Sequence, residues 1–148
     1  MTSCLPRSCK CGAASVEAAP DDVWPWVCQI RLAPYSYDWI DNLGRRSPRQ
    51  LRDLPKPRPG QHFTTAGGRR FGQILAVESA QQLTARIIGA VVSYVLVPID
   101  NGTRLLFKAV LARYRLLGPL LSLGDLVMAR RQLLNLKQLA EGREVGRR

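Results

Sequence analysis

The sequence has few of the residues that metal sites and acid–base catalysts use. His62 is the only histidine, and the four cysteines, Cys4, Cys9, Cys11 and Cys28, lie in the first fifth of the chain. A structural zinc site needs paired ligands at short, regular spacing, and these cysteines lack it. We therefore expect no metal and no cofactor, and free thiols with Cys28 buried as a small apolar side chain.

Long apolar runs are also missing. The longest stretch without a charge covers residues 87–99 and contains Gly89 and Pro98. It has thirteen residues, whereas a membrane-spanning helix needs about 20. Residues 1–10 lack the apolar centre of a secretory signal. We expect a cytoplasmic protein with no transmembrane segment.

Acidic residues are scarce relative to basic ones. The chain has 11 Asp and Glu against 22 Lys and Arg, a net charge of +11. Such an excess favours an acidic partner, either nucleic acid or an anionic membrane surface. However, the charge gathers in a proline-rich stretch, residues 45–58, and no aromatic and basic strand motif accompanies it. We expect no specific nucleic-acid partner and at most a weak contact with an anionic membrane.

Length and composition indicate one folded unit. A chain of 148 residues with 46% apolar residues is long enough for a single core. We expect a loose leader at residues 1–10, a single domain at 11–142 and a basic tail at 143–148, as a monomer or a homodimer.

The first half of the chain suggests one strand and two short helices. Residues 11–18 suit a strand, and Pro20 suits the first position of a helix. Pro25 fits that helix only if it begins late, because proline lacks the N–H that an interior position donates. A second helix at residues 37–43 has Ser36 as its N-cap.

The second half suggests antiparallel strands at residues 71–78, 82–88 and 91–97. Asn101-Gly102 then predicts a hairpin with a type I′ turn. In the strand that follows, alternation predicts one buried face, formed by Thr103, Leu105, Phe107, Ala109 and Leu111.

A long helix at residues 119–141 is expected to end the fold, with Gly142 as its stop signal. Its broad apolar surface predicts deep burial against the sheet.

This order of elements is that of the helix-grip fold. The segments 23–27 (Val-Trp-Pro-Trp-Val), 35–44 (Tyr-Ser-Tyr-Asp-Trp-Ile-Asp-Asn-Leu-Gly) and 59–61 (Pro-Gly-Gln) resemble a bacterial branch of the SRPBCC superfamily, a branch of unknown function. The segments 101–105 and 124–128 fit the same branch. The superfamily also includes START lipid-transfer domains and polyketide cyclases. The resemblance implies an α+β fold in which a curved antiparallel sheet wraps around a long C-terminal helix, with a ligand cavity between them.

Candidate ligand-binding residues follow from the aromatic cluster and from the inward positions of strands and helix. They are Tyr35, Tyr37, Trp39, Phe71, Phe107, Leu123, Val127 and Met128. Trp24 and Trp26 are better explained as core side chains that join helix and sheet.

Three functions remain open from the residues and the resemblance. The first is binding of a small hydrophobic molecule, such as a lipid, polyketide or isoprenoid. The second is a cyclase or aromatase, with Tyr35, Asp38 or His62 as proton donors or acceptors. The third is a basic adaptor that meets a membrane surface or nucleic acid through residues 45–58. The binding function is favoured over an enzyme, because no catalytic motif accompanies these residues.

Overall fold

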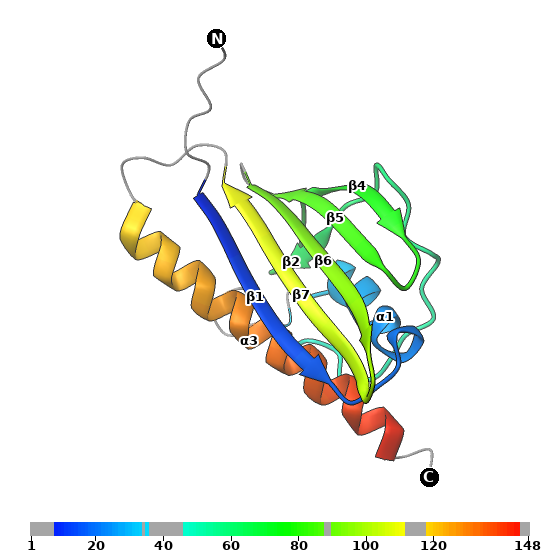
Figure 1. Ribbon diagram of the computed structural model, residues 1–148. Coiled ribbons are helices and arrows are strands. Elements are labelled where there is room, and N and C mark those ends of the chain that lie inside the picture. The colour runs from blue at the N-terminus through cyan, green and yellow to red at the C-terminus, as the bar shows by residue number, and fades with distance from the viewer. Residues whose placement is uncertain (1–7, 34, 36–45, 88–89, 112–117, 146–148) are drawn as a thin grey trace.

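An antiparallel sheet with both described α-helices on one side organises the chain (Figure 1). The computed structural model describes residues 8–33, 35, 46–87, 90–111 and 118–145. The elements in these ranges are β1 (Ser8–Val16), α1 (Pro20–Cys28), the 3-10 turn η1 (Gln29–Arg31), β2 (Thr64–Ala66), β3 (Arg69–Phe71), β4 (Gln73–Glu78), β5 (Gln82–Ile87), β6 (Ala90–Ile99), β7 (Gly102–Leu111) and α3 (Gly118–Val145). The predicted α+β class is confirmed.

The main sheet has the strand order β1-β7-β6-β5-β4, and every neighbouring pair is antiparallel. Consecutive strands from β4 to β7 pair as hairpins. The strand β1 instead pairs with β7 from Ser8↔Leu111 to Val16↔Thr103. The first strand therefore lies beside the last one, and β2 pairs with β3 in a separate small sheet.

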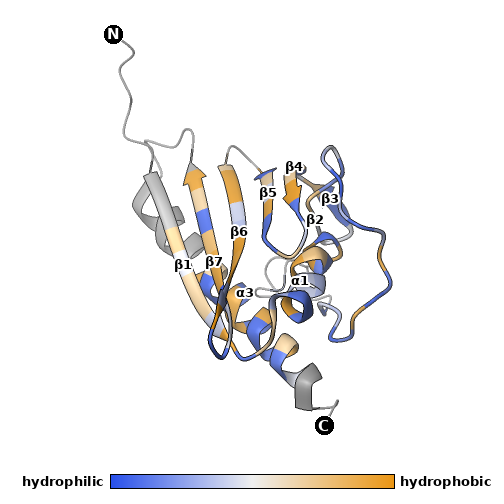
Figure 2. Cartoon of the chain, turned by 45° about the vertical axis from the view of Figure 1, so that its right-hand side comes forward, coloured by the Kyte–Doolittle hydropathy of each residue, from blue (hydrophilic) through white to orange (hydrophobic). Residues whose placement is uncertain are grey.

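Alternating side chains give the sheet one buried face, as the sequence pattern predicts. On β7, Thr103 and Leu105 are fully buried while Arg104 and Lys108 are exposed. On β6, Val92, Tyr94 and Leu96 are buried in the same way. Figure 2 shows the resulting apolar character of β6 and β7.

The two helices cover the buried face. The helix α1 contributes Val23, Trp26 and Val27 to the core, and α3 contributes Leu133 and Leu136. Each such side chain stabilises the fold by about 1.5–3 kcal/mol when it leaves water. The helix α3 contacts β1, β7 and α1, so the ends of the fold pack on each other.

At the N-terminal end the structure differs from expectation in two places. The strand β1 begins at Ser8, three residues earlier than the expected strand at 11–18, because it follows β7 along its length. The helix α1 does not begin late: it starts at Pro20 and keeps Pro25 inside it. Pro25 has no N–H for the carbonyl of Asp21, and tertiary packing of the helix outweighs that loss.

The expected strand at residues 71–78 is divided at Gly72, where the chain leaves the small sheet for the main one. Gly72 has a φ of 68°, and a Cβ there would lie 2.5 Å from the carbonyl oxygen of Arg86. Only glycine fits this left-handed position so close to a neighbouring strand. The expected strands at 82–88 and 91–97 match β5 and β6 closely.

The hairpin between β6 and β7 forms where expected but with a different turn. Ile99 pairs with Gly102, so Asp100 and Asn101 form the turn, and neither has a positive φ. The type I′ assignment is therefore wrong. Gly102 is needed for another reason, since a Cβ there would lie 2.1 Å from the carbonyl oxygen of Val16.

The helix α3 also differs from its expected limits. It begins one residue earlier than predicted and continues through Gly142 to Val145. Gly142 is therefore a helical position and not a stop. The expected second helix at residues 37–43 lies outside the described residues.

Candidate functional site

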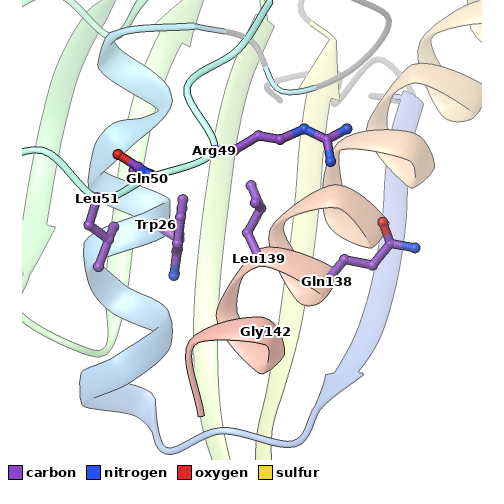
Figure 3. Close-up of a pocket in the computed structure, with 7 residues that line it drawn as sticks. All are labelled: Trp26, Arg49, Gln50, Leu51, Gln138, Leu139 and Gly142. Carbon is purple, nitrogen blue, oxygen red and sulfur yellow. The ribbon is translucent and has the colours of Figure 1, made fainter. Parts of the chain in front are cut away.

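A pocket of about 450 Å³ opens between α1, the last turns of α3 and the segment at residues 49–51 (Figure 3). Its apolar walls come from one residue of each element: Trp26, Leu51 and Leu139. Polar and small residues complete the lining, and they are Arg49, Gln50, Gln138 and Gly142. No acidic residue is among these lining residues.

Trp26 is the unusual member of this lining. It lies on the inner face of α1 and is only 2% exposed. Its indole nitrogen Nε1 is buried and has no hydrogen-bond partner among the described residues. Buried polar groups are nearly always paired, and an unpaired one costs about 1–3 kcal/mol. A residue of the pocket lining therefore carries a buried N–H group for which the described part of the chain supplies no acceptor.

The wall formed by residues 49–51 is held by buried Gln29. Its Nε2 donates to the hydroxyl oxygen of Tyr35 at 2.6 Å and to the carbonyl oxygen of Gln50 at 2.9 Å. Its Oε1 accepts from the backbone N–H of Arg52 at 2.9 Å. Gln29 thus joins the segment at 49–52 to η1 and fixes the position of Leu51.

Arg31 fixes the next part of the same segment. Its guanidinium donates to the carbonyl oxygens of Cys28 and Pro55, and to Oε1 of Gln61. Burial lowers the pKa of this guanidinium, and the nearby Cys28 thiolate would raise it. The contacts to carbonyl oxygens indicate that Arg31 has a structural role.

Away from the pocket, aromatic side chains fill the space between the sheet and the middle of α3. The ring of Tyr94 lies 5.2 Å from that of Phe107 and 6.2 Å from that of Phe63, measured between centroids. The hydroxyl of Tyr94 donates to Oε1 of Gln132 at 2.6 Å. Burial raises the pKa of the Tyr94 hydroxyl. This region is packed core.

Tyr35 lies behind the pocket wall and joins three segments. It is 2% exposed and has a φ of 55°. Its hydroxyl donates to the carbonyl oxygen of Pro48, and its own carbonyl accepts from Nδ2 of Asn135 on α3. The hydroxyl of Tyr35 therefore both donates a hydrogen bond and accepts one, because its oxygen also accepts from Gln29.

The other predicted ligand-binding residues lie apart from this pocket. Phe107 packs against Tyr94 in the core, and Phe71 is half-buried in the small sheet. On α3, Met128 is half-buried and Val127 is 46% exposed. The structure does not bring these four to the pocket at α1.

The remaining predicted residues are His62 and four others. His62 is half-buried next to Phe63 and does not line the pocket. Tyr37, Asp38 and Trp39 lie outside the described residues, as does the side chain of Leu123. In the part of the chain that the structure describes, no group of three His, Cys, Asp or Glu side chains could hold a metal ion.

Sequence reasoning missed most of the lining. The sequence predicts an irregular solvated connection at residues 49–51 and a place for Leu139 in the apolar stripe of the helix. It predicts Gly142 as the end of that helix. The only signal available was Trp26, an aromatic side chain with a polar N–H on a short apolar helix face.

Comparison with known proteins defines the fold. No family model and no curated protein matches the chain. Among solved structures, an AHSA1-like protein from Aeromonas hydrophila is 18% identical, with 93% of this chain and 95% of that one covered and a TM-score of 0.61. An AHSA1-like protein from Rhizobium etli is 16% identical, with 93% and 84% covered and a TM-score of 0.59. A protein from Mesorhizobium loti is 19% identical, with 91% and 98% covered and a TM-score of 0.60.

At these identities the likeness concerns the fold alone. The chain has the fold of AHSA1-like proteins, which is consistent with the expected SRPBCC-type helix-grip architecture. Across the described ranges, no helix combines the length and the apolar character that crossing a membrane requires.

Proposed function

We propose that this protein binds a small, largely apolar molecule in the pocket between α1 and α3. The observation that carries the proposal is the buried, unpaired indole N–H of Trp26 on the wall of this pocket. A volume of about 450 Å³ is within the range of small-molecule sites, which combine apolar walls with a few placed polar groups. The helix-grip fold of the structural neighbours supports a ligand-binding function in general terms.

This pocket is not the cavity that the resemblance implies between the sheet and the C-terminal helix. Along residues 127–142 of α3, side chains of the core fill the space that faces the sheet. A cavity near Leu123 stays a prediction, because that side chain lies outside the described residues. The pocket at Trp26 supports ligand binding independently of that cavity.

Gly142 offers a direct test of the proposal. It lines the pocket, and a Cβ built on it has nothing within 4 Å. Gly142→Leu therefore adds an apolar side chain at the pocket where its first carbon meets no neighbour, and leucine favours the helix. We expect octanol, titrated as a neutral apolar probe, to shift the Trp26 indole resonance in NMR spectra. We expect Gly142→Leu to weaken binding at least about tenfold.

Gly142→Ala is the matched control, because it makes the same gain in helix propensity and fills little of the pocket. It should bind octanol like the natural protein. If octanol does not bind, or binds equally well to Gly142→Leu, the proposed site is wrong. Native mass spectrometry of the freshly purified protein adds a second check, because a co-purified ligand should be lost from Gly142→Leu.

A further inference from the structure

The charge around the pocket is one-sided. Arg49 is exposed and is the only charged residue among the described lining residues. Glu141 precedes the lining residue Gly142 on α3, and its carboxylate accepts from the backbone N–H of Glu17 and pairs with Lys137 at 3.6 Å. An anion at Arg49 would therefore meet a positive group with no lining carboxylate to oppose it.

The second polar feature lies at the other end of the pocket. In Figure 3 the side chain of Arg49 runs along one end, and the indole nitrogen of Trp26 lies toward Gly142 at the opposite end. In Figure 3 the side chain of Leu139 lies between α1 and α3, and that of Leu51 lies beside α1. The Trp26 nitrogen is buried, and no described residue supplies an acceptor for it.

We propose that the ligand is an apolar anion with an oxygen acceptor at the end remote from its charge, as in a hydroxy acid or an oxo acid. This inference rests on the proposed function. The anionic group pairs with the guanidinium of Arg49, a geometry that suits both carboxylate and phosphate. The apolar body packs against Trp26, Leu51 and Leu139. The distal oxygen accepts the hydrogen bond from Nε1 of Trp26.

A probe series of one chain length separates the two polar contacts. Octanol, octanoate, ω-hydroxyoctanoate and octylamine are titrated by calorimetry, and the Trp26 indole resonance is followed by NMR. We expect octanoate to bind about tenfold more tightly than octanol because of the charge-assisted hydrogen bond. We expect ω-hydroxyoctanoate to bind more tightly again and to move the Trp26 N–H resonance downfield.

Arg49→Gln tests the charged contact. It should remove the preference for octanoate over octanol. Arg46→Gln is the matched control: it removes an equal charge from the same segment, and Arg46 does not line the pocket. It should keep the preference. Octyl phosphate in the same series distinguishes a phosphate headgroup from a carboxylic acid, since whichever anion binds more tightly identifies the group that suits Arg49.

The inference fails separately from the proposed function. Equal binding of octanol and octanoate, or tighter binding of octylamine, overturns the inference and leaves the apolar site in place. The inference is also wrong, with the apolar site still in place, if ω-hydroxyoctanoate and octanoate give the same Trp26 N–H resonance. If none of the probes binds, or if they bind Gly142→Leu as tightly as the natural protein, the proposed function itself fails.

Discussion

Burial changes the acid–base chemistry of single side chains, and Cys28 is the clearest case. It is 8% exposed, and burial raises the pKa of its thiol from 9.0 to about 11, against a smaller opposite effect of Arg31. The folded state therefore holds this proton more firmly than the unfolded chain does. The contribution to stability is complete below pH 9 and is lost as the pH rises toward 11.

Alkaline unfolding of a Cys28→Ala variant tests this. Urea unfolding of the natural protein between pH 9 and 11 should show a loss of about 2–3 kcal/mol from this group. Cys28→Ala should show a shallower decline, with a remaining slope from Tyr94, whose pKa burial also raises. Cys11→Ala, at an exposed position, should keep the natural slope. Equal slopes in all three proteins would contradict the assignment.

The burial of Trp26 could be predicted from the sequence, but its role in the pocket could not. Helical spacing with Val23 and Val27 places it on the inner face of α1. Whether its N–H finds a partner depends on groups from α3 and from residues 49–51, which approach only in the folded chain. The lining at Leu139 and Gly142 likewise follows from the angle at which α3 packs on α1, which no local pattern encodes.

The sequence patterns predict helices and strands correctly where tertiary packing and local preference favour the same structure. The strand predicted at residues 91–97 is confirmed as β6, and the alternation in β7 predicts both that strand and its buried face. The patterns failed where tertiary contacts decide the outcome. Pro25 stays inside α1 because the helix is packed, and Gly72 divides a strand because the backbone of Arg86 comes close. Gly142 does not end α3, since glycine in a helix costs only about 1 kcal/mol.

The segment at residues 47–52 depends on Gln29 for its position. Gln29→Ala removes three hydrogen bonds of a fully buried side chain. It also leaves the hydroxyl of Tyr35 without that donor. We expect a loss of about 2–4 kcal/mol in the free energy of unfolding, measured in urea. Octanol affinity should also fall, because Leu51 loses its support.

Gln81→Ala serves as the control for this variant. Gln81 is exposed in the turn between β4 and β5, and it does not line the pocket. It should change stability by less than about 0.5 kcal/mol. A stable Gln29→Ala variant with natural octanol affinity would show that the segment holds its position without Gln29.

The whole molecule carries a large excess of positive charge. With 22 basic and 11 acidic residues, repulsion among exposed cations opposes the folded state. Salt shortens the range of this repulsion, and the Debye length is about 10 Å at 0.1 M ionic strength. We therefore expect the melting temperature to rise between low salt and about 0.5 M NaCl, where the Debye length is shorter still.

A double variant, Arg46→Glu with Arg58→Glu, supplies the control. Both positions are exposed in the segment before β2, so the exchange lowers the net charge without touching the core. Its melting temperature should depend less on salt than that of the natural protein. A melting temperature that falls with salt would show that ion pairs outweigh the repulsion.

The pairing of β1 with β7 has a consequence for how the chain reaches this state. During synthesis β1 is made long before β7, yet among the described strands β7 is its only neighbour in the main sheet. Until β7 emerges, the hydrogen-bonding groups of β1 must remain in water or with a chaperone, because distant pairings form late. The pairing of β1 with β7 is therefore the last step that completes the sheet. An arrested nascent chain that ends before Gly102 should expose β1 to proteases.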